Sequence, residues 1–326
     1  MDSVKKKSLA MVLGLALGMG FVAPTTALAD NKYVAITSIV EHPALDAFKD
    51  GVVEALDAEG FKQGENLRIK YQTAQSNTGT AAQIARQYIG EGPDVIVAIG
   101  TPSAQAVVAA TKSIPVVFGA ITDPVAAQLV KDRGPSGTNV TGMSDELPLK
   151  ASLELIKKTL PKAQKVGLVY NPGEINSKIV VEQLKVMMPE YGLTLVEAAA
   201  PRTVDVSSAA RNLVGKADVI FSTTDNNVIA TYESLTKVSL ASKLPLIASD
   251  TGSVERGAIA ALGVNYKQLG MQAGQMVARI LNGENPGDIA WETSDQLEIH
   301  LNKKIADQIG FEFSEELVES AEKVLE

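Results

Sequence analysis

The 326-residue chain contains no cysteine, two histidines and one tryptophan, and only 5% of its residues are aromatic. Without cysteine it can form neither a disulfide framework nor a cysteine-metal site, and two histidines leave few candidates for imidazole chemistry. The net charge of −8 argues against nucleic-acid binding, which requires a basic face. Beyond the first 29 residues no apolar run reaches the about 20 residues that a transmembrane helix needs.

Residues 1–29 have the pattern of a cleavable signal peptide. Three lysines at 5–7 form a basic start, residues 9–22 are apolar, and residues 27–29 match an A-x-A cleavage site. The apolar run is shorter than the about 20 residues of a membrane span, and no cysteine follows that could carry a lipid anchor. We therefore expect a soluble periplasmic protein that is not a lipoprotein, and an acidic exported protein of this kind suits a carrier of small molecules.

Two apolar strands with polar ends lie in the N-terminal half. Residues 94–99 and 115–118 are the apolar, β-branched runs typical of strands buried on both faces. A helical segment at 104–111 connects them, so the two strands are expected to be parallel. The polar turns at 100–103 and 119–124 then lie at the same edge of the sheet, which is where open α/β sheets bind ligands.

The same order of strands and turns returns in the second half of the chain. Asp218-Val-Ile corresponds to Asp94-Val-Ile, and Pro245-Leu-Ile corresponds to Pro115-Val-Val. This shared order predicts two βα lobes of similar topology that arose by duplication. We expect strands at residues 33–39, 67–71, 94–99, 115–118 and 139–143, and again at 166–170, 193–198, around 218 and 245, and at 258–264.

Amphipathic helices are expected between these strands and after each closing strand. In the C-terminal tail we expect one strand at 296–301 and a charged amphipathic helix near 315–324. The expected helices are residues 44–59, 81–89, 104–111, 147–160, 177–188, 206–214 and 266–281.

Seven short segments, spread over almost all of the chain after the signal peptide, carry a resemblance to a known family. They are EHPALD (41–46), GTPSA (100–104), FGAITDP (118–124), NVTG (139–142), YNP (170–172), DN (225–226) and NYKQLG (265–270). With them the chain resembles the periplasmic substrate-binding proteins of ABC importers, in particular the tryptophan- and tyrosine-type. The resemblance implies a type I periplasmic-binding-protein fold, an α/β class with two doubly wound lobes, mostly parallel sheets and a three-stranded hinge.

The resemblance also implies the division of the chain and its partners. It gives an N-lobe of residues 30–145 plus 266–293 and a C-lobe of residues 146–265 plus 294–326, with crossovers near Ser144, Asn265 and Ser294. The lobes are expected to close around a ligand by a hinge motion. The partners are then the ligand and an ABC permease with its ATPase, and we expect a monomer with no cofactor and no nucleic acid.

A small ligand, most readily an amino acid such as tryptophan, tyrosine or phenylalanine, is the substrate that the resemblance implies. A carboxylate suits a helix N-terminus such as Thr101 and Ser103, or the turn at 76–80. An ammonium suits Asp225 or Asp250, with Asp123 as a competitor. The residues expected at the ligand are Glu41, Ser76, Thr78, Thr101, Ser103, Ala120, Asp123, Asn171, Asp225, Asn226 and Asp250.

A capping role is the alternative for each of these residues, because Ser, Thr, Asp and Asn are also the usual N-caps of helices. His42 and Asn176 lie in the corresponding strand-exit turns. An aromatic ligand requires rings or apolar walls, for which Phe118, Tyr170 and Tyr232 are candidates.

Other functions receive less support. The sequence contains no G-x-S-x-G, H-E-x-x-H or Walker A motif and no cysteine nucleophile, so we expect no enzyme and no metal site. Asp225 and Asp250 as a catalytic acid/base pair would be the enzymatic alternative. A periplasmic sensing module for a membrane receptor remains open, as does another small polar solute such as a nucleoside or a short peptide.

Overall fold

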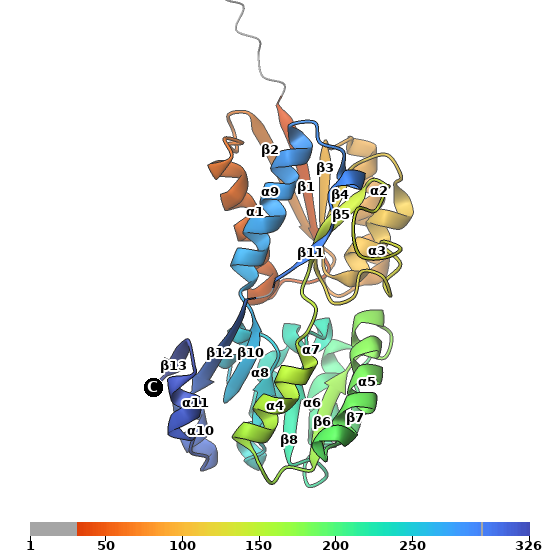
Figure 1. Cartoon of the computed structure of the whole chain (residues 1–326). Helices are drawn as coiled ribbons and strands as arrows, with labels where there is room; N and C mark the ends of the chain where they lie inside the picture. The colour runs from red at the N-terminus through yellow and green to blue at the C-terminus, as the bar shows by residue number, and fades with distance from the viewer. Residues whose placement is uncertain (1–30, 295) are drawn as a thin grey trace, which may run out of the picture. The chain divides into compact units, whose positions relative to one another are not determined.

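The computed structural model describes residues 31–294 and 296–326, so the expected signal peptide at residues 1–29 lies outside the described residues. The chain forms two α/β units, each built around one sheet (Figure 1). The first sheet has six strands in the order β11-β5-β4-β3-β1-β2, and the second has seven in the order β13-β12-β10-β9-β8-β6-β7. The expected fold class, with two doubly wound and mostly parallel sheets, is confirmed.

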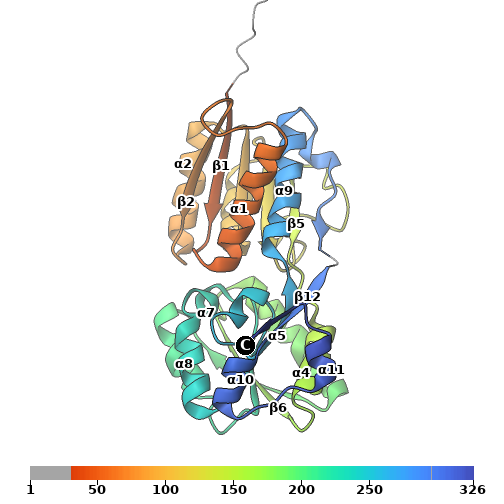
Figure 2. The ribbon, with the colours of Figure 1, turned by 90° about the vertical axis from the view of Figure 1, so that its left-hand side faces the viewer.

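All strand pairs described in the first sheet are parallel. Helices α1 and α9 pack together on one face of this sheet, and α2 and α3 pack together on the other. Figure 2 shows α1 and α9 side by side on the face toward the viewer. The elements are β1 (Lys32–Ser38), α1 (Pro43–Ala58), β2 (Leu67–Thr73), α2 (Thr78–Glu91), β3 (Val95–Ile99), α3 (Thr101–Ala110), β4 (Val116–Ile121), β5 (Val140–Ser144), α9 (Tyr266–Leu281) and β11 (Glu292–Thr293).

The second sheet repeats this arrangement and adds two strands from the C-terminal tail. Among its described pairs, only β12 with β10 is antiparallel. Its elements are α4 (Leu149–Thr159), β6 (Lys165–Tyr170), α5 (Ile175–Met187), β7 (Thr194–Ala199), α6 (Val206–Arg211), β8 (Val219–Ser222), α7 (Asn226–Ala230), α8 (Tyr232–Ser242), β9 (Leu246–Ala248), β10 (Ala260–Val264), β12 (Leu297–Asn302), α10 (Lys303–Ile309), α11 (Glu315–Glu319) and β13 (Lys323–Leu325).

The tail differs from the sequence-based expectation. The helix expected near 315–324 ends at Glu319, and residues 323–325 form β13, which pairs with β12 in parallel. Val318 and Val324 both pack against the core of the second sheet. Apolar residues at this spacing fit either one helix or a helix followed by a strand. The strand forms because residues 323–325 can pair with the edge of β12.

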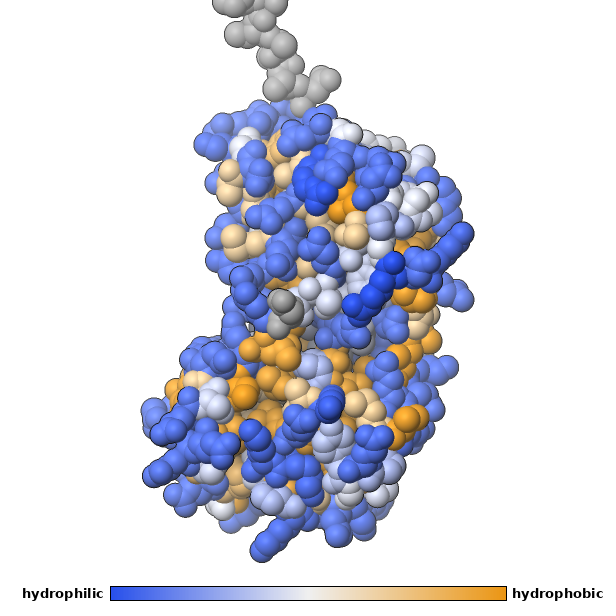
Figure 3. All heavy atoms as spheres, in the orientation of Figure 1, coloured by the Kyte–Doolittle hydropathy of each residue, from blue (hydrophilic) through white to orange (hydrophobic). Residues whose placement is uncertain are grey.

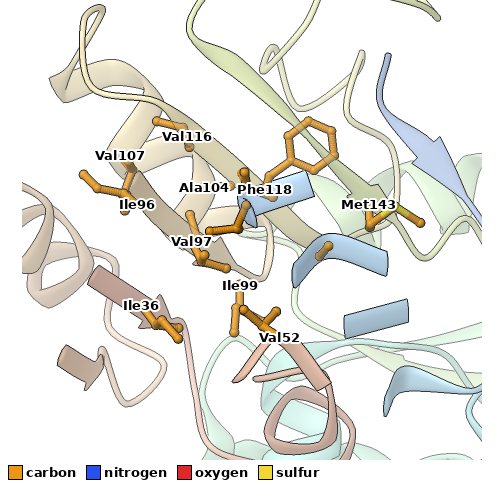
Figure 4. Packing of buried hydrophobic residues seen from close by; sticks show 14 of the residues in the cluster. Ile36, Val52, Ile96, Val97, Ile99, Ala104, Val107, Val116, Phe118 and Met143 are labelled. Atoms are coloured by element: carbon orange, nitrogen blue, oxygen red, sulfur yellow. The ribbon is translucent and has the colours of Figure 1, made fainter. Parts of the chain in front are cut away.

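The strands are apolar because the helices cover both faces of each sheet. Every residue of β3 and β4 is buried. Figure 4 shows residues of neighbouring elements gathered in this core, for example Ile96 of β3, Val107 of α3 and Val116 of β4.

Helix α9 follows β10 of the second sheet in sequence, yet it packs on the first sheet against α1. Glycines allow the two helix backbones to touch. A Cβ on Gly270 would lie 2.0 Å from the carbonyl oxygen of Phe48, and one on Gly51 would lie 2.1 Å from that of Lys267. The chain thus passes between the sheets after β5, around Asn265, and between β11 and β12.

The surface is largely hydrophilic on the face that Figure 3 shows. In the described part of the chain, the large apolar side chains that are exposed are scattered singly; they are Val125, Val186, Val204, Val214 and Leu297. Within residues 31–294 and 296–326, no helix combines the length and the apolar character that crossing a membrane requires.

Candidate ligand-binding site

A cavity lies where the carboxyl ends of the parallel strands of both sheets meet. Its volume is about 20 Å³, which leaves room for about one water molecule. Most of the lining side chains are polar, which is the composition of a site for a polar solute. The lining residues are His42, Leu45, Gly100, Thr101, Ala120, Thr122, Asp145, Asn176, Thr224, Asn226 and Tyr266.

The N-terminus of α3 opens at this cavity without a side-chain cap. Its N-cap residue is Gly100, at φ +83°, where a Cβ would lie 2.5 Å from the Cγ2 of Ile39. Thr101 and Ser103 in the first turn are buried, and the Ser103 hydroxyl has no hydrogen-bond partner among the described residues. Free N–H groups and the positive end of the helix dipole make such a helix start a site for a carboxylate.

Two strand ends near this helix hold residues in a strained backbone. Ala120 lines the cavity at φ +53°, at a register shift between Gly119 and Ile121 in the pairing of β4 with β5. Ser76, after β2, has φ +60°, and its hydroxyl is buried without a partner in the described part of the chain. Left-handed geometry in residues other than glycine costs free energy and is concentrated at functional sites. These two predicted residues therefore have the geometry expected of a binding site.

Asp225 occupies the second-sheet position that corresponds to Gly100 of the first, and it is fully engaged. Its Oδ1 accepts a hydrogen bond from the backbone N–H of Val228 at 3.0 Å and so caps α7. Its Oδ2 accepts from the N–H of Asn171 and from the hydroxyl of Ser177, both at 2.6 Å. Burial raises the pKa of Asp225. This carboxylate organises the turn after β6.

Glu174 is a buried carboxylate that the sequence-based prediction missed. It accepts hydrogen bonds from the side-chain amides of Asn171 at 3.0 Å and Asn226 at 2.5 Å. Burial raises its pKa, and the nearby charge of Asp225 adds to the effect. Glu174 thereby fixes Asn226, which lines the cavity, and connects it to Asn171.

Asp250 is also buried and serves as a cap. Both of its oxygens accept hydrogen bonds from Ser253, one from the backbone N–H and one from the hydroxyl, at the start of a short 3₁₀ helix (Thr251–Val254). Burial raises the pKa of Asp250. Close by, the hydroxyls of Ser222 and Ser249 at the ends of β8 and β9 are buried and lack a partner among residues 31–294 and 296–326.

Asp145 and Tyr266 lie at two of the crossings between the sheets. Asp145 follows β5 directly, Tyr266 is the first residue of α9, and the Tyr266 hydroxyl donates to Oδ2 of Asp145 at 2.5 Å. Oδ1 of Asp145 is buried and has no partner within the described residues. Burial raises the pKa of Asp145 to about 6, and the hydrogen bond from Tyr266 opposes this rise.

The sequence carried one signal for this pair. The expected crossovers near Ser144 and Asn265 each precede one of the two residues, and a crossing segment between lobes must border the space between them.

Glu41, Thr78 and Asp123 lie outside the cavity lining, whereas His42 is part of it. Glu41 is exposed, whereas its neighbour His42 is buried, accepts from the N–H of Leu45 and caps α1. Burial, followed by the charge of Arg256, lowers the pKa of His42 to about 3, so the ring is neutral near pH 7.

Thr78 is exposed in the first turn of α2, where Asn77 is the cap. Asp123 is half-buried and accepts from the backbone N–H groups of Val125 and Ala126. Asp123 thus has a local role in its turn.

The rings considered for an aromatic ligand lie elsewhere. Phe118 is in the core beside Trp291, Tyr232 is fully buried, and the Tyr170 hydroxyl donates to Glu197. The aromatic ring that the cavity lining does contain is that of Tyr266.

The two-sheet fold and the polar cavity at the strand ends are the features expected of a solute-binding protein. The family model for ABC transporter substrate binding proteins matches residues 33–325, and the chain belongs to this family. It is therefore a binding protein and not an enzyme, as expected from the sequence.

Similar proteins agree with this assignment. A tyrosine-binding protein of Clostridioides difficile is 40% identical over 301 residues, which cover 89% of this chain and 87% of that protein. A conserved domain protein of Vibrio cholerae has a similar structure, with a TM-score of 0.89 and 44% identity over 90% of this chain and 100% of that one. An ABC domain of Streptococcus pneumoniae in complex with L-Trp has a TM-score of 0.87 and 33% identity over 91% of this chain and 100% of that one.

Proposed function

We propose that this protein binds an α-amino acid at the cavity between the two strand-end edges and delivers it to an ABC permease with its ATPase. The proposal depends on one observation: groups that suit a carboxylate and groups that suit an ammonium lie at the same cavity. The uncapped start of α3 suits a carboxylate, and buried carboxylates stand around the same cavity. A zwitterion needs both.

The similar proteins favour an aromatic amino acid. The Clostridioides difficile relative is named a tyrosine-binding protein, and the Streptococcus pneumoniae structure holds L-Trp. Tyr266 in the lining offers a ring face or edge to such a side chain. The small volume of the cavity implies that the strand-end edges separate to admit a ligand of this size.

We further propose the lobe division expected from the sequence, with residues 30–145 plus 266–293 as one lobe and residues 146–265 plus 294–326 as the other. The three passages of the chain between the sheets support a hinge there. Residues 1–29 would direct export to the periplasm, and the protein would act as a monomer.

A thermal-shift screen of ligand-stripped protein with the twenty amino acids tests the proposal. A ligand at 100 times its Kd should add about 2.7 kcal/mol to the free energy of unfolding. We expect aromatic amino acids to raise the melting temperature most, with isothermal titration calorimetry giving the affinity. A panel of nucleosides and dipeptides is the comparison. Stabilisation by that panel alone, with no response to any amino acid, would contradict the proposed ligand class.

A further inference from the structure

Four buried carboxylates surround the strand-end edges, and they differ in how many of their oxygens are engaged. Asp225 accepts from three donors, while Glu174 and Asp250 each have both oxygens engaged. Asp145 accepts from Tyr266 through Oδ2 alone, and its Oδ1 is buried without a partner in the described part of the chain. A buried carboxylate oxygen left without a donor is costly.

Among residues 31–294 and 296–326, no cationic side chain offsets the negative charge of Asp145. Tyr266 of α9 faces it as a hydrogen-bond donor, and Asp250, after β9, acts on it as a second negative charge. His42, before α1, lines the same cavity but is neutral near pH 7. A cationic donor in the cavity would engage the free oxygen and offset the buried negative charge at once.

We infer that Oδ1 of Asp145 accepts the ammonium group of the bound amino acid and that Tyr266 is the positioning residue that holds this carboxylate in place. The inference rests on the proposed amino-acid function and assigns the ammonium to a residue at the hinge. Asp225 and Asp250, expected from the sequence to hold the ammonium, instead have their oxygens bonded to backbone and serine donors. Asp145 and Tyr266 lie on two separate crossings and are already hydrogen-bonded to each other, so a bound ammonium would join a network that spans both crossings.

The assignment makes binding depend on pH. Burial raises the pKa of Asp145 to about 6, and an ammonium binds the ionised carboxylate. Affinity should therefore be constant above about pH 7 and fall as the pH drops through about 6. Below that value each binding event releases one proton from Asp145 to the buffer. Removing the Tyr266 hydroxyl removes a bond that holds this pKa down, so the fall in affinity should begin at a higher pH.

The test uses isothermal titration calorimetry with L-tyrosine and L-tryptophan as probes, between pH 5 and pH 8. We expect Asp145→Asn to weaken both about 10- to 100-fold at pH 7.5, as for loss of a charge-assisted hydrogen bond, and to flatten the pH profile. Tyr266→Phe should weaken binding several-fold and move the profile to higher pH. A merely structural role for Tyr266 would leave the profile in place.

A matched control and a matched probe complete the design. Asp218→Asn makes the same change at the opposite edge of the second sheet, where Asp218 accepts from the N–H groups of Gln164 and Lys165. It should leave the affinity unchanged. The acid 3-(4-hydroxyphenyl)propanoate, which is tyrosine without its amino group, should bind wild type and Asp145→Asn equally. Circular dichroism confirms that each variant is folded.

The outcomes separate the two proposals. Wild type that binds a probe while Asp145→Asn binds it within about threefold of wild type overturns the Asp145 assignment and leaves amino-acid binding intact. Equal losses of L-tyrosine and of the deaminated acid in Asp145→Asn also overturn it, because the ammonium would then not be the group concerned. Wild type that binds none of the twenty amino acids removes the proposed function itself.

Discussion

The two sheets repeat one topology, but their corresponding helix starts have opposite chemistry. After β3, α3 begins at Gly100 with no side-chain cap; after β8, at the matching position, α7 begins at Asp225 with its cap engaged. Near the end of β4 the strand bulges at Ala120, which has a strained backbone, whereas the turn after β9 is capped by Asp250. One of the two units thus leaves donors open to the cavity, and in the other the buried carboxylates form a hydrogen-bonded frame.

Under the proposed function, this difference explains how two units of the same topology would form one asymmetric site. A zwitterion has one end of each charge, so two identical edges would suit only one of them. The uncapped helix start on one side suits the carboxylate, and the acidic frame on the other side suits the ammonium. Asp145 and Tyr266 lie where the two sides join.

The largest effect on stability is expected in the unit of the second sheet, where the buried carboxylates form the hydrogen-bonded frame. Asp225→Ala should lower the free energy of unfolding by about 3 kcal/mol, because it leaves three buried donors without a partner. Urea denaturation at pH 7.5 measures this loss. Asp123→Ala, which removes a cap at a half-exposed turn, is the control and should cost about 1 kcal/mol. A loss for Asp225→Ala no larger than for the control would contradict the frame role.

The next effect concerns Asp145, whose replacement should raise the free energy of unfolding instead of lowering it. Its native pKa of about 6 lies above the ordinary value of about 3.9, so the native state loses stability as the pH rises between about 4 and 6. Asp145→Asn removes this penalty and should stabilise the ligand-free protein by on the order of 3 kcal/mol at pH 7.5 and by little at pH 4. Melting curves at the two pH values measure it.

Asp218→Asn provides the contrast for this measurement. The backbone N–H groups of Gln164 and Lys165 lower the pKa of Asp218, so its loss should destabilise the protein at pH 7.5. The same sign for both variants at pH 7.5 would show that Asp145 carries no buried-charge penalty.

The smallest effect is expected at the uncapped start of α3 in the unit of the first sheet. Ser103→Ala should weaken amino-acid binding by about 1 kcal/mol, about fivefold, as for one neutral hydrogen bond. It should leave the melting temperature of the ligand-free protein nearly unchanged, because the Ser103 hydroxyl has no partner among the described residues. Calorimetry and a melting curve together check both halves. Ser239→Ala, whose hydroxyl donates to Leu244, should show the reverse: lower stability and unchanged affinity.

Much of this architecture could be predicted because a parallel strand that is buried on both faces must consist almost entirely of apolar residues. The runs at 94–99 and 115–118 are apolar because helices cover them, and β3 and β4 lie at these positions. Ala120 lies at the end of a strand, and Thr101 and Asn226 begin the helices that follow strands, so topology alone brought them to the cavity. The tail was harder to predict, since β13 exists only because β12 offers it an edge.

The site was less predictable, because strand ends can be read from a sequence and hydrogen bonds cannot. Asp225, Asp250 and Asp145 are all polar residues beside apolar runs, and nothing in their spacing distinguishes a cap from a binding group. Glu174 lies in a turn where an exposed role was equally compatible with the sequence. Only packing shows which of these oxygens have donors.

The sequence by itself determined the repeated α/β units, the edge at which polar residues collect and, through its resemblance, the family. The pattern of apolar residues predicts the strands, the helices and their order directly, because each buried position requires an apolar residue. Tertiary structure alone decided that α3 starts without a side-chain cap, that α7 starts with one, and that one oxygen of Asp145 has no partner among the residues that the structure describes. These features depend on atoms far apart in the chain meeting within about 3 Å.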